Sequence, residues 1–352
     1  MTLVVLVVLL AVAAASLVAL AAIVLLRRSG PGHEPDTAHR EHGRRRVAVV
    51  VNPTKFDDVA AARRQVASTC TALGWAAPLW LETTADDPGR GQTRQALADG
   101  VDLVCALGGD GTVRTVAENV VHTGVPLGLL PQGTGNLLAR NLGLPLDDLD
   151  ASLRIALTGA DRTVDVGRVA FDVSGEDADP VEQVFLVMAG LGFDAAMMAG
   201  VTEQLKARVG WLAYVFAGLT NLGGERVKVW MSADSGPQVV RRVRTVIVGN
   251  CGRLTGGIVL IPDAEVDDGW LDVVALAPRG VVSWASMATR VLSRREDRRV
   301  GRRRCRQVRV RCDPPQQGQL DGDPVGLVRA IRARIDAGAL IVRVPAPTAT
   351  RG

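Results

Sequence analysis

Two glycine-rich segments in this sequence have residue types that suit phosphate binding. They are Gly108-Gly109-Asp110-Gly111-Thr112 and Gly133-Thr134-Gly135-Asn136. Glycine lets backbone N–H groups approach a bound phosphate closely, and a following helix N-terminus adds a favourable dipole. The threonine hydroxyls add polar groups, and Asp110 is suited to a metal ion or a phosphate-bound water. Two such loops in consecutive units therefore predict a phosphate site.

Two common nucleotide-binding motifs do not account for these loops. Gly133-Thr134-Gly135 begins a dinucleotide fingerprint, but Leu138 stands where the third small residue is required. A P-loop needs a lysine after G-x-x-x-x-G, and none of the three lysines has that spacing. What remains is phosphate binding by backbone amides and threonines.

The segments around the loops predict the elements that position them. Short apolar runs at 47–51, 101–107 and 125–130 indicate buried strands, and the last two lead into the glycine loops and then into helical patterns. This repeated order favours a parallel sheet in an α/β domain. From about residue 164, short strands separated by turns indicate a mainly antiparallel β domain. They are predicted at 164–170, 184–188, 227–231, 243–248, 271–276, 308–311 and 340–344, with helical segments at 195–222 and 281–292.

The first 26 residues are uncharged and long enough to cross a bilayer as a helix. A cleaved secretory signal would begin with basic residues, whereas here Arg27 and Arg28 follow the apolar run. The positive-inside rule then places the rest of the chain in the cytoplasm. We therefore predict a single-pass protein of the cell membrane with its catalytic part in the cytoplasm.

Few residues are available for disulfide, zinc or histidine chemistry. The five cysteines include no C-x-x-C pair, which argues against a disulfide framework or a thiolate zinc site. Three of the four histidines lie in the polar stretch 29–46, so only His122 remains in the body of the chain for a triad or a metal site.

Five motifs, in their order along the chain, resemble those of the diacylglycerol kinase catalytic domain. They are Asn52-Pro53-Thr54, Gly108-Gly109-Asp110-Gly111-Thr112, Pro131-Gln132-Gly133-Thr134-Gly135-Asn136, Asp263-Ala264-Glu265-Val266-Asp267-Asp268-Gly269-Trp270-Leu271-Asp272 and Gln319-Leu320-Asp321-Gly322-Asp323-Pro324. The chain is similar to bacterial diacylglycerol/sphingosine-type lipid kinases over about residues 47–344. The resemblance implies an α/β nucleotide-binding domain of the NAD kinase/diacylglycerol kinase type, followed by a β-rich lipid-binding domain.

The predicted fold class is therefore α/β plus β, preceded by an N-terminal transmembrane helix. The predicted parts are a transmembrane anchor at 1–28, a polar linker at 29–46, an α/β ATP-binding domain at 47–163 and a β-rich lipid-binding domain at 164–331. Residues 332–346 are expected to pack back onto the α/β domain.

The resemblance also implies which residues bind ATP and a magnesium ion. The ATP contacts would be Asn52, Pro53, Thr54, Lys55, Phe56, Gly108, Gly109, Asp110, Gly111, Thr112, Val113, Arg114, Gly133, Thr134, Gly135, Asn136, and either Thr83 or Thr84. Magnesium would bind Asp268 and the backbone carbonyls of Glu265 and Trp270, which is an all-oxygen set. Lys55 and Phe56 depart from the family, which has small residues and a glycine there.

The proton acceptor of the family falls on Asp323, where glutamate is usual. Aspartate can act as a general base but is one methylene shorter. Asp321 is the alternative acceptor, and Asp110 would help to order the metal and the phosphates. The implied reaction transfers the γ-phosphate of ATP to a hydroxyl of a membrane lipid, with diacylglycerol giving phosphatidic acid.

Two alternative functions stay open at this point. A kinase for a soluble substrate, of the NAD kinase or phosphofructokinase type, shares the G-G-D-G-T loop. A catalytically inactive lipid-binding protein would explain Asp323 in place of glutamate.

A basic zone at 290–311 holds 11 arginines against two acidic residues and follows the amphipathic segment 281–292. Basic residues beside an apolar face favour anionic headgroups, so the sequence predicts contact with an anionic membrane surface. Aromatic residues do not interleave with these arginines, which argues against nucleic acid as a partner. A homodimer is a further alternative that the sequence leaves open.

Overall fold

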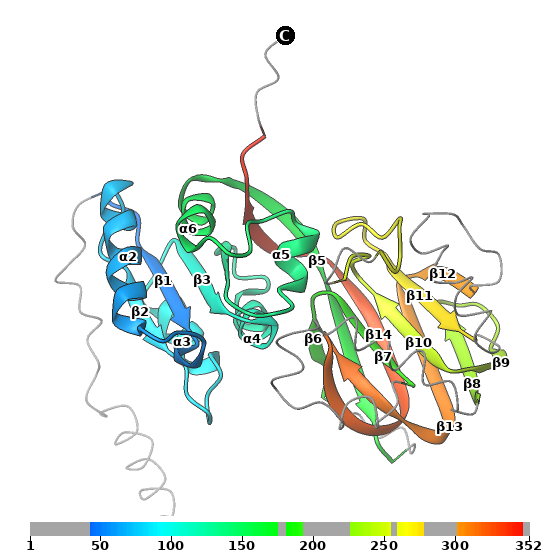
Figure 1. Cartoon of the computed structure of the whole chain (residues 1–352). Helices are drawn as coiled ribbons and strands as arrows, with labels where there is room; N and C mark the ends of the chain where they lie inside the picture. Colours follow the sequence, from blue (N-terminus) through cyan, green and yellow to red (C-terminus); the bar gives the residue numbers. More distant parts are fainter. Residues whose placement is uncertain (1–42, 175–180, 193–225, 255–258, 278–300, 348–352) are drawn as a thin grey trace, which may run out of the picture. The chain divides into compact units, whose positions relative to one another are not determined.

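The computed structural model describes residues 43–174, 181–192, 226–254, 259–277 and 301–347 (Figure 1). The chain divides into the units Met1–Arg44 and Arg45–Gly352. All of the described helices and strands belong to the second unit.

The first part of this unit is a parallel sheet covered by helices (Figure 1). Its strands lie in the order β4-β3-β1-β2, and each neighbouring pair is parallel. The strands are β1 (Val47–Val51), β2 (Leu79–Glu82), β3 (Leu103–Gly108) and β4 (Leu127–Pro131). The helices are η2 (Pro53–Lys55), α2 (Val59–Ala72), α3 (Arg90–Ala98), α4 (Asp110–Val120), α5 (Leu137–Asn141) and α6 (Leu149–Thr158).

The alternation of side chains along β1 explains why helices cover both faces of this sheet. Val47, Val49 and Val51 are buried in one cluster with residues of α2 and α6. Ala48 and Val50 are buried in a second cluster with residues of α3 and α4. A strand that is apolar on both faces is typical of a parallel sheet between two helical layers.

Mainly antiparallel strands make up the rest of the sheet. They are β5 (Ala160–Asp172), β6 (Gln183–Phe185), β7 (Met188–Leu191), β8 (Val227–Ala233), β9 (Val239–Val243), β10 (Thr245–Gly249), β11 (Leu271–Leu276), β12 (Gly301–Cys305), β13 (Gln307–Leu320) and β14 (Asp323–Val344). The main path runs β12-β11-β10-β7-β13-β14 and then continues to β4.

Strand β14 links the two parts of the sheet. It pairs with β5 from Ala330 opposite Asp172 to Val344 opposite Ala160. Near its end, Val342 is the parallel partner of Leu127 in β4. The chain therefore returns to the parallel strands after forming the antiparallel ones.

The sequence predicted β1 residue for residue and predicted β3 and β4 to within two residues at each end. Strand β2 and helices α2, α3 and α6 were missed. Strands β13 and β14 are far longer than the predicted segments 308–311 and 340–344. The helical segments predicted at 195–222 and 281–292 lie outside the described residues. The domain limits stay predictions, and β5 runs without interruption through the predicted limit after residue 163.

The prediction of a transmembrane helix requires a correction. Among the described residues, no helix is long and apolar enough to cross a bilayer. Their longest helix, α2, has 14 residues, whereas about 20 are needed to span the hydrocarbon core. The segment 1–28, to which the anchor was assigned, lies outside the described residues. The fold class is corrected to the α/β plus β architecture without the transmembrane helix, and the single-pass membrane location is not retained.

Candidate functional site

The carboxyl ends of the parallel strands bring the predicted ATP-binding segments to one edge of the sheet. Asn52 follows β1, Thr83 follows β2, Gly109 follows β3 and Gln132 follows β4. The amide of Gln132 donates to the carbonyl of Gly108 at 2.9 Å, which joins the ends of β3 and β4. Ligands of open α/β sheets bind at this edge.

The two glycine loops touch each other through their backbones. A Cβ atom on Gly133 would lie 2.7 Å from Cα of Gly109, which is closer than Cβ atoms approach other atoms in proteins. A Cβ atom on Gly108 would lie 2.6 Å from Oγ1 of Thr112. Packing between the loops therefore requires glycine at Gly133, and packing within the first loop requires glycine at Gly108. Gly111 has open space around it instead.

Asp110 ties the first glycine loop to the helix that follows the second. Its Oδ1 accepts a hydrogen bond from the amide of Leu137 at 2.6 Å. Burial raises the pKa of Asp110 to about 6, and the carboxylates of Asp321 and Asp323 act in the same direction. The structure thus gives Asp110 a linking contact between the loops, beside its predicted role in ordering phosphates.

The second glycine loop is folded by its own asparagine. Asn136 has a φ of 49°, in the left-handed region that asparagine tolerates better than most residues. Its Oδ1 accepts from Gly133 N at 2.9 Å, and its Nδ2 donates to Gly133 O at 2.7 Å. This places Thr134 at an exposed position between the two glycines.

The predicted residues of the first glycine loop differ in accessibility. Thr112 and Val113 are buried. The amide of Val113 already donates to Gly109 O at 3.0 Å, as part of helix α4. Gly109, Asp110 and Arg114 are partly exposed. A ligand at this edge would therefore contact the start of α4 rather than Val113.

The first motif forms a short turn at the end of β1. Oδ1 of Asn52 accepts hydrogen bonds from the amide and the hydroxyl of Thr54, at 3.1 Å and 2.8 Å. This cap starts the single 3₁₀ turn of η2 at Pro53. Lys55 is exposed, whereas Phe56 packs against the buried cluster of α2 and α6.

The two candidate threonines after β2 have different surroundings. Thr83 is buried, and its amide donates to Val51 O at 2.8 Å. Thr84 is exposed, and its hydroxyl accepts from the amide of Asp87 at 3.1 Å. Both lie at the ligand-binding edge, so the choice between them stays open.

The predicted proton acceptor lies directly after a tight hairpin turn between β13 and β14. Leu320 pairs with Asp323 across this turn, and Asp321 and Gly322 have φ values of 48° and 95°. An Asp-Gly pair is favoured in two-residue turns because both central residues adopt positive φ.

Arg114 connects this hairpin to the first glycine loop. From helix α4, its Nη2 donates to Oδ2 of Asp323 at 2.8 Å, and its Nη1 donates to Leu320 O at 3.1 Å. Its Nη1 also lies 3.8 Å from Oδ2 of Asp321. One guanidinium therefore holds both ends of the turn beside the helix that begins at the glycine loop.

The two carboxylates of the hairpin are in different environments. Asp321 is buried and accepts hydrogen bonds from the amides of Leu186, Val187 and Met188, the last two at 2.9 Å and 3.0 Å. Burial raises the pKa of Asp321 against the opposing effect of Arg114 and these amides. The Asp323 side chain is 59% exposed. Of the two predicted acceptors, Asp323 is therefore the accessible carboxylate, whereas Asp321 anchors the turn.

Comparisons with known proteins agree with these motifs. Residues 46–169 match the family described as diacylglycerol kinase catalytic domain, and residues 187–344 match the YegS C-terminal NAD kinase beta sandwich-like domain. A probable YegS-like lipid kinase of Pseudomonas aeruginosa is 34% identical over 269 residues, which cover 75% of this chain and 83% of that protein. The chain belongs to the diacylglycerol kinase catalytic-domain family. The predicted family is confirmed, and with it a phosphotransferase of the lipid kinase type.

Other relatives of this lipid kinase differ in how much they share with it. A diacylglycerol kinase of Mycobacterium tuberculosis is 31% identical over 179 residues, which cover 51% of this chain and 56% of that protein. The crystal structure of a diacylglycerol kinase from Bacillus anthracis matches with a TM-score of 0.68, over 86% of this chain and 98% of that one. Its sequence identity is 22%, so this likeness shows the fold alone.

The magnesium position implied by the family is held by an arginine in this lipid kinase. Oδ1 of Asp268 accepts from the amide of Trp270 at 3.0 Å, and its Oδ2 is paired with the guanidinium of Arg304. Glu265 is exposed. Within the described part of the chain, no three or more histidine, cysteine or acidic residues cluster as metal ligands. A magnesium ion does not fit here, because a cation already neutralises the carboxylate.

The sequence reasoning missed two contacts that organise the site. The ion pair of Asp268 with Arg304 and the bond from Arg114 to Asp323 both join residues far apart in the chain. The basic zone at 290–311 is described from residue 301 onward, and there Arg302 pairs with Asp272 at 2.8 Å. Contact with an anionic membrane surface stays an untested prediction.

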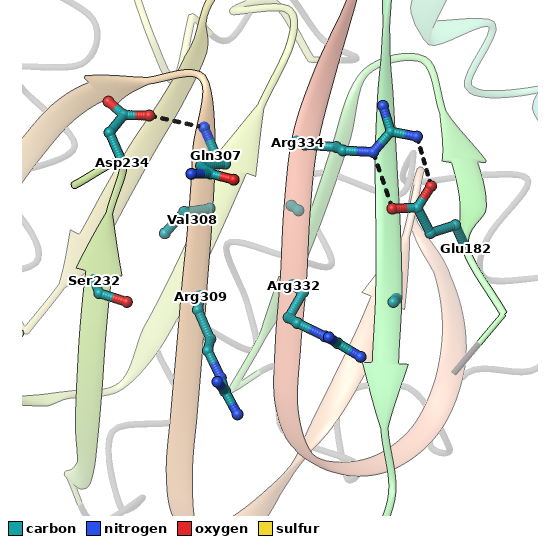
Figure 2. Close-up of a pocket in the computed structure, with 10 residues that line it drawn as sticks. Glu182, Ser232, Asp234, Gln307, Val308, Arg309, Arg332 and Arg334 are labelled. Atoms are coloured by element: carbon teal, nitrogen blue, oxygen red, sulfur yellow. Dashed lines mark hydrogen bonds and ion pairs between the residues drawn. The ribbon is translucent and has the colours of Figure 1, made fainter. Parts of the chain in front are cut away.

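A cavity of about 370 Å³ lies in the β-rich part and contains none of the predicted site residues (Figure 2). Strands β5, β8, β13 and β14 contribute to its lining. Figure 2 shows the forked ion pair of Arg334 with Glu182, whose hydrogen bonds are 2.9 Å and 2.7 Å long. None of the residues that line this cavity belongs to the glycine loops or to the turn between β13 and β14.

Proposed function

We propose that this lipid kinase transfers the γ-phosphate of ATP to the free hydroxyl of diacylglycerol, giving phosphatidic acid and ADP. The observation that carries the proposal is the bond from Arg114 to Asp323 at 2.8 Å. It brings an exposed carboxylate beside the helix that starts at the first glycine loop. A general base and a phosphate-binding loop are the two parts that a phosphoryl transfer to a hydroxyl requires.

ATP would bind at the carboxyl edge of the parallel strands. The two glycine loops and the N-terminus of α4, an 11-residue helix, offer backbone N–H groups to the phosphates. Asn52 and Thr54 border the same edge after β1. Magnesium would arrive with the nucleotide as the usual companion of its phosphates. No protein ligand is assigned to that ion.

Asp323 would accept the proton of the lipid hydroxyl as that oxygen attacks the γ-phosphorus. One O–P bond forms to the lipid, the bond between the γ-phosphorus and the bridging oxygen breaks, and ADP leaves. Arg114 is charged at any physiological pH, so it keeps Asp323 oriented and can also face the spreading negative charge. Asp321 would hold the turn in place without exchanging a proton with the substrate.

The shorter side chain of Asp323 is compatible with this role because Arg114 holds the turn from two sides. Nη1 on Leu320 O and Nη2 on Asp323 fix the start and the end of the turn relative to α4. A hairpin that is held in this way keeps the carboxylate in one position relative to α4.

The experiment is a transfer assay with ATP labelled at the γ-phosphate and a panel of acceptors. Diacylglycerol, monoacylglycerol, phosphatidylglycerol, a sphingoid base and NAD are each offered at the same concentration. We expect label in the organic extract, with diacylglycerol giving the highest rate. Label on NAD alone would identify a kinase for a soluble substrate. Binding to liposomes without any transfer would identify an inactive lipid-binding protein.

A further inference from the structure

The loop 263–270 is the place where the family resemblance implies a magnesium ion, and in this chain it carries its own cation. Arg304 is paired with the Asp268 carboxylate, whose side chain is only 16% exposed. The other oxygen of that carboxylate accepts from Trp270 N at 3.0 Å. Both oxygens of Asp268 therefore have a donor from the protein itself.

Strand pairing brings Arg304 near the end of this loop. In the antiparallel pair of β11 and β12, Arg304 lies opposite Asp272, two residues after Trp270. The Arg304 guanidinium also lies 5.6 Å from the centre of the Trp270 ring, and that of Arg306 lies 5.2 Å from it. An arginine held by a strand and by an aromatic face is fixed in orientation more than one on a mobile loop.

Two other acidic groups of the loop, Asp263 and Asp267, are also paired within the protein. Arg302 pairs with Asp263 and with Asp272. Arg162 donates to Asp267 at 2.9 Å. These arginines compensate the negative charges of Asp263 and Asp267 without a metal ion.

A buried carboxylate closes the loop from the other side. Oδ2 of Asp165 accepts from Gly269 N at 2.6 Å, and its Oδ1 accepts from Gly338 N at 2.7 Å. Asp165 is 3% exposed. The loop is thus attached to β5 and to the irregular part of β14 without a metal ion.

Arg304 and a magnesium ion would compete for the same oxygen of Asp268, because the other oxygen already accepts from Trp270 N. Magnesium requires near-octahedral oxygen ligands at about 2.0–2.1 Å, whereas arginine stays protonated and offers only donors. Binding of the ion at Oδ2 would therefore require Arg304 to leave Asp268.

We propose that Arg304 takes the place of the metal ion at Asp268, so that the loop 263–270 and the β-rich part around it are held together without magnesium. This inference concerns stability and does not depend on which acceptor the kinase uses. The proposal concerns the position at Asp268 and not the metal ions that bind together with ATP.

The test is thermal unfolding of the full chain without nucleotide, in EDTA and in excess magnesium or manganese. We expect the wild-type Tm to be the same in all three. For Arg304→Met we expect a Tm lower by about 2–6 °C in EDTA and partly restored by either metal, since Asp268 then lacks its cation. Arg306→Met is the matched control, because Arg306 also stacks on Trp270 but has no ion pair with Asp268 among the contacts of the described residues. It should stay insensitive to metal.

Metal content after dialysis gives a second readout. The wild type should retain no magnesium or manganese, and Arg304→Met should bind one of them. A wild-type Tm that falls in EDTA would overturn the proposal, and so would an Arg304→Met variant that gains neither metal nor stability from it. If Arg304→Met does not fold, Asp268→Asn serves instead. It should lower the Tm equally with and without metal, and a metal-dependent loss would contradict the inference.

Discussion

Nη2 of Arg114 donates a hydrogen bond to Oδ2 of Asp323 at 2.8 Å across 209 positions of sequence. Arg114 belongs to the helix that follows the first glycine loop, and Asp323 opens the last strand. The same guanidinium reaches Leu320 O at 3.1 Å. This contact joins the predicted phosphate-binding loop to the proposed proton acceptor.

Replacing Arg114 should lower stability. In Arg114→Gln, the carbonyl of Leu320 loses a charged donor and the buried Asp321 loses its nearby cation. We expect the free energy of unfolding to fall by about 1–3 kcal/mol, measured by urea denaturation. In a double-mutant cycle with Asp323→Asn, the coupling should be only about 0.5–1 kcal/mol, because Asp323 is exposed.

The control for this change is Arg90→Gln. Arg90 pairs with Glu118 at 3.1 Å, but its side chain is 55% exposed. Its loss should change the unfolding free energy by less than about 0.5 kcal/mol. An equal effect of both variants would show that Arg114 makes no more than an ordinary surface contact.

Asp321→Asn should damage the fold more than Asp323→Asn. Asp321 accepts hydrogen bonds from the amides of Leu186, Val187 and Met188 with two oxygens, whereas asparagine has only one. The NH₂ group of the new asparagine would then face a buried backbone N–H, and both are donors. The expected loss is about 2–4 kcal/mol in the free energy of unfolding. Urea denaturation of both variants compares them directly, and a smaller loss for Asp321→Asn would contradict the anchoring role.

Gly133→Ala should lower stability, whereas Gly109→Ala should leave it nearly unchanged. The new methyl group of the first variant would lie 2.7 Å from Cα of Gly109, so the backbone must move. The nearest atom to a methyl group on Gly109 would be 3.5 Å away, an ordinary contact. We expect a loss of about 1–3 kcal/mol for Gly133→Ala only. Equal Tm values for the two variants would refute the close packing of the loops.

The raised pKa of Asp110 predicts a pH dependence of stability. The folded protein holds this proton up to about pH 6, whereas the unfolded chain releases it near its ordinary value of about 4. The stability contributed by protonation is therefore complete at low pH and is lost as the pH rises through about 6. Relative to Asp110→Asn, the wild type should gain about 1 kcal/mol between about pH 7 and about pH 5. Unfolding free energies that change in parallel for both proteins would contradict the raised pKa.

Local patterns in the sequence predicted the parallel strands and the glycine loops because those features depend on neighbouring residues. Val47–Val51 is apolar at every position, as a strand between two helical layers must be. Strand β2 was missed because Leu79, Trp80 and Leu81 are only half-buried at the sheet edge. In β13, only Val308, Val310 and Cys312 alternate inward over a short stretch, so its full length could not be predicted.

The sequence did not predict the contacts that organise the site, and the reason is different. The contact of Arg114 with Asp323 depends on how α4 lies against the β13–β14 hairpin, and that of Arg304 with Asp268 depends on the pairing of β11 with β12. Residue spacing reveals neither. Family resemblance placed a magnesium ion at Asp268, and the register of β12 beside β11 places a guanidinium there. The predicted transmembrane helix rested on the hydropathy of the first 26 residues and on the arginines that follow them.

The most direct measurement is the rate of γ-phosphate transfer by Asp323→Asn, with ATP affinity measured on the same protein and Asp323→Glu as the conservative control. If Asp323 accepts the lipid proton, kcat should fall about 10²–10⁴-fold in Asp323→Asn, with the ATP Kd within about twofold of the wild type. Asp323→Glu should keep most of the activity. A wild-type kcat in Asp323→Asn would contradict the assignment of this carboxylate as the proton acceptor.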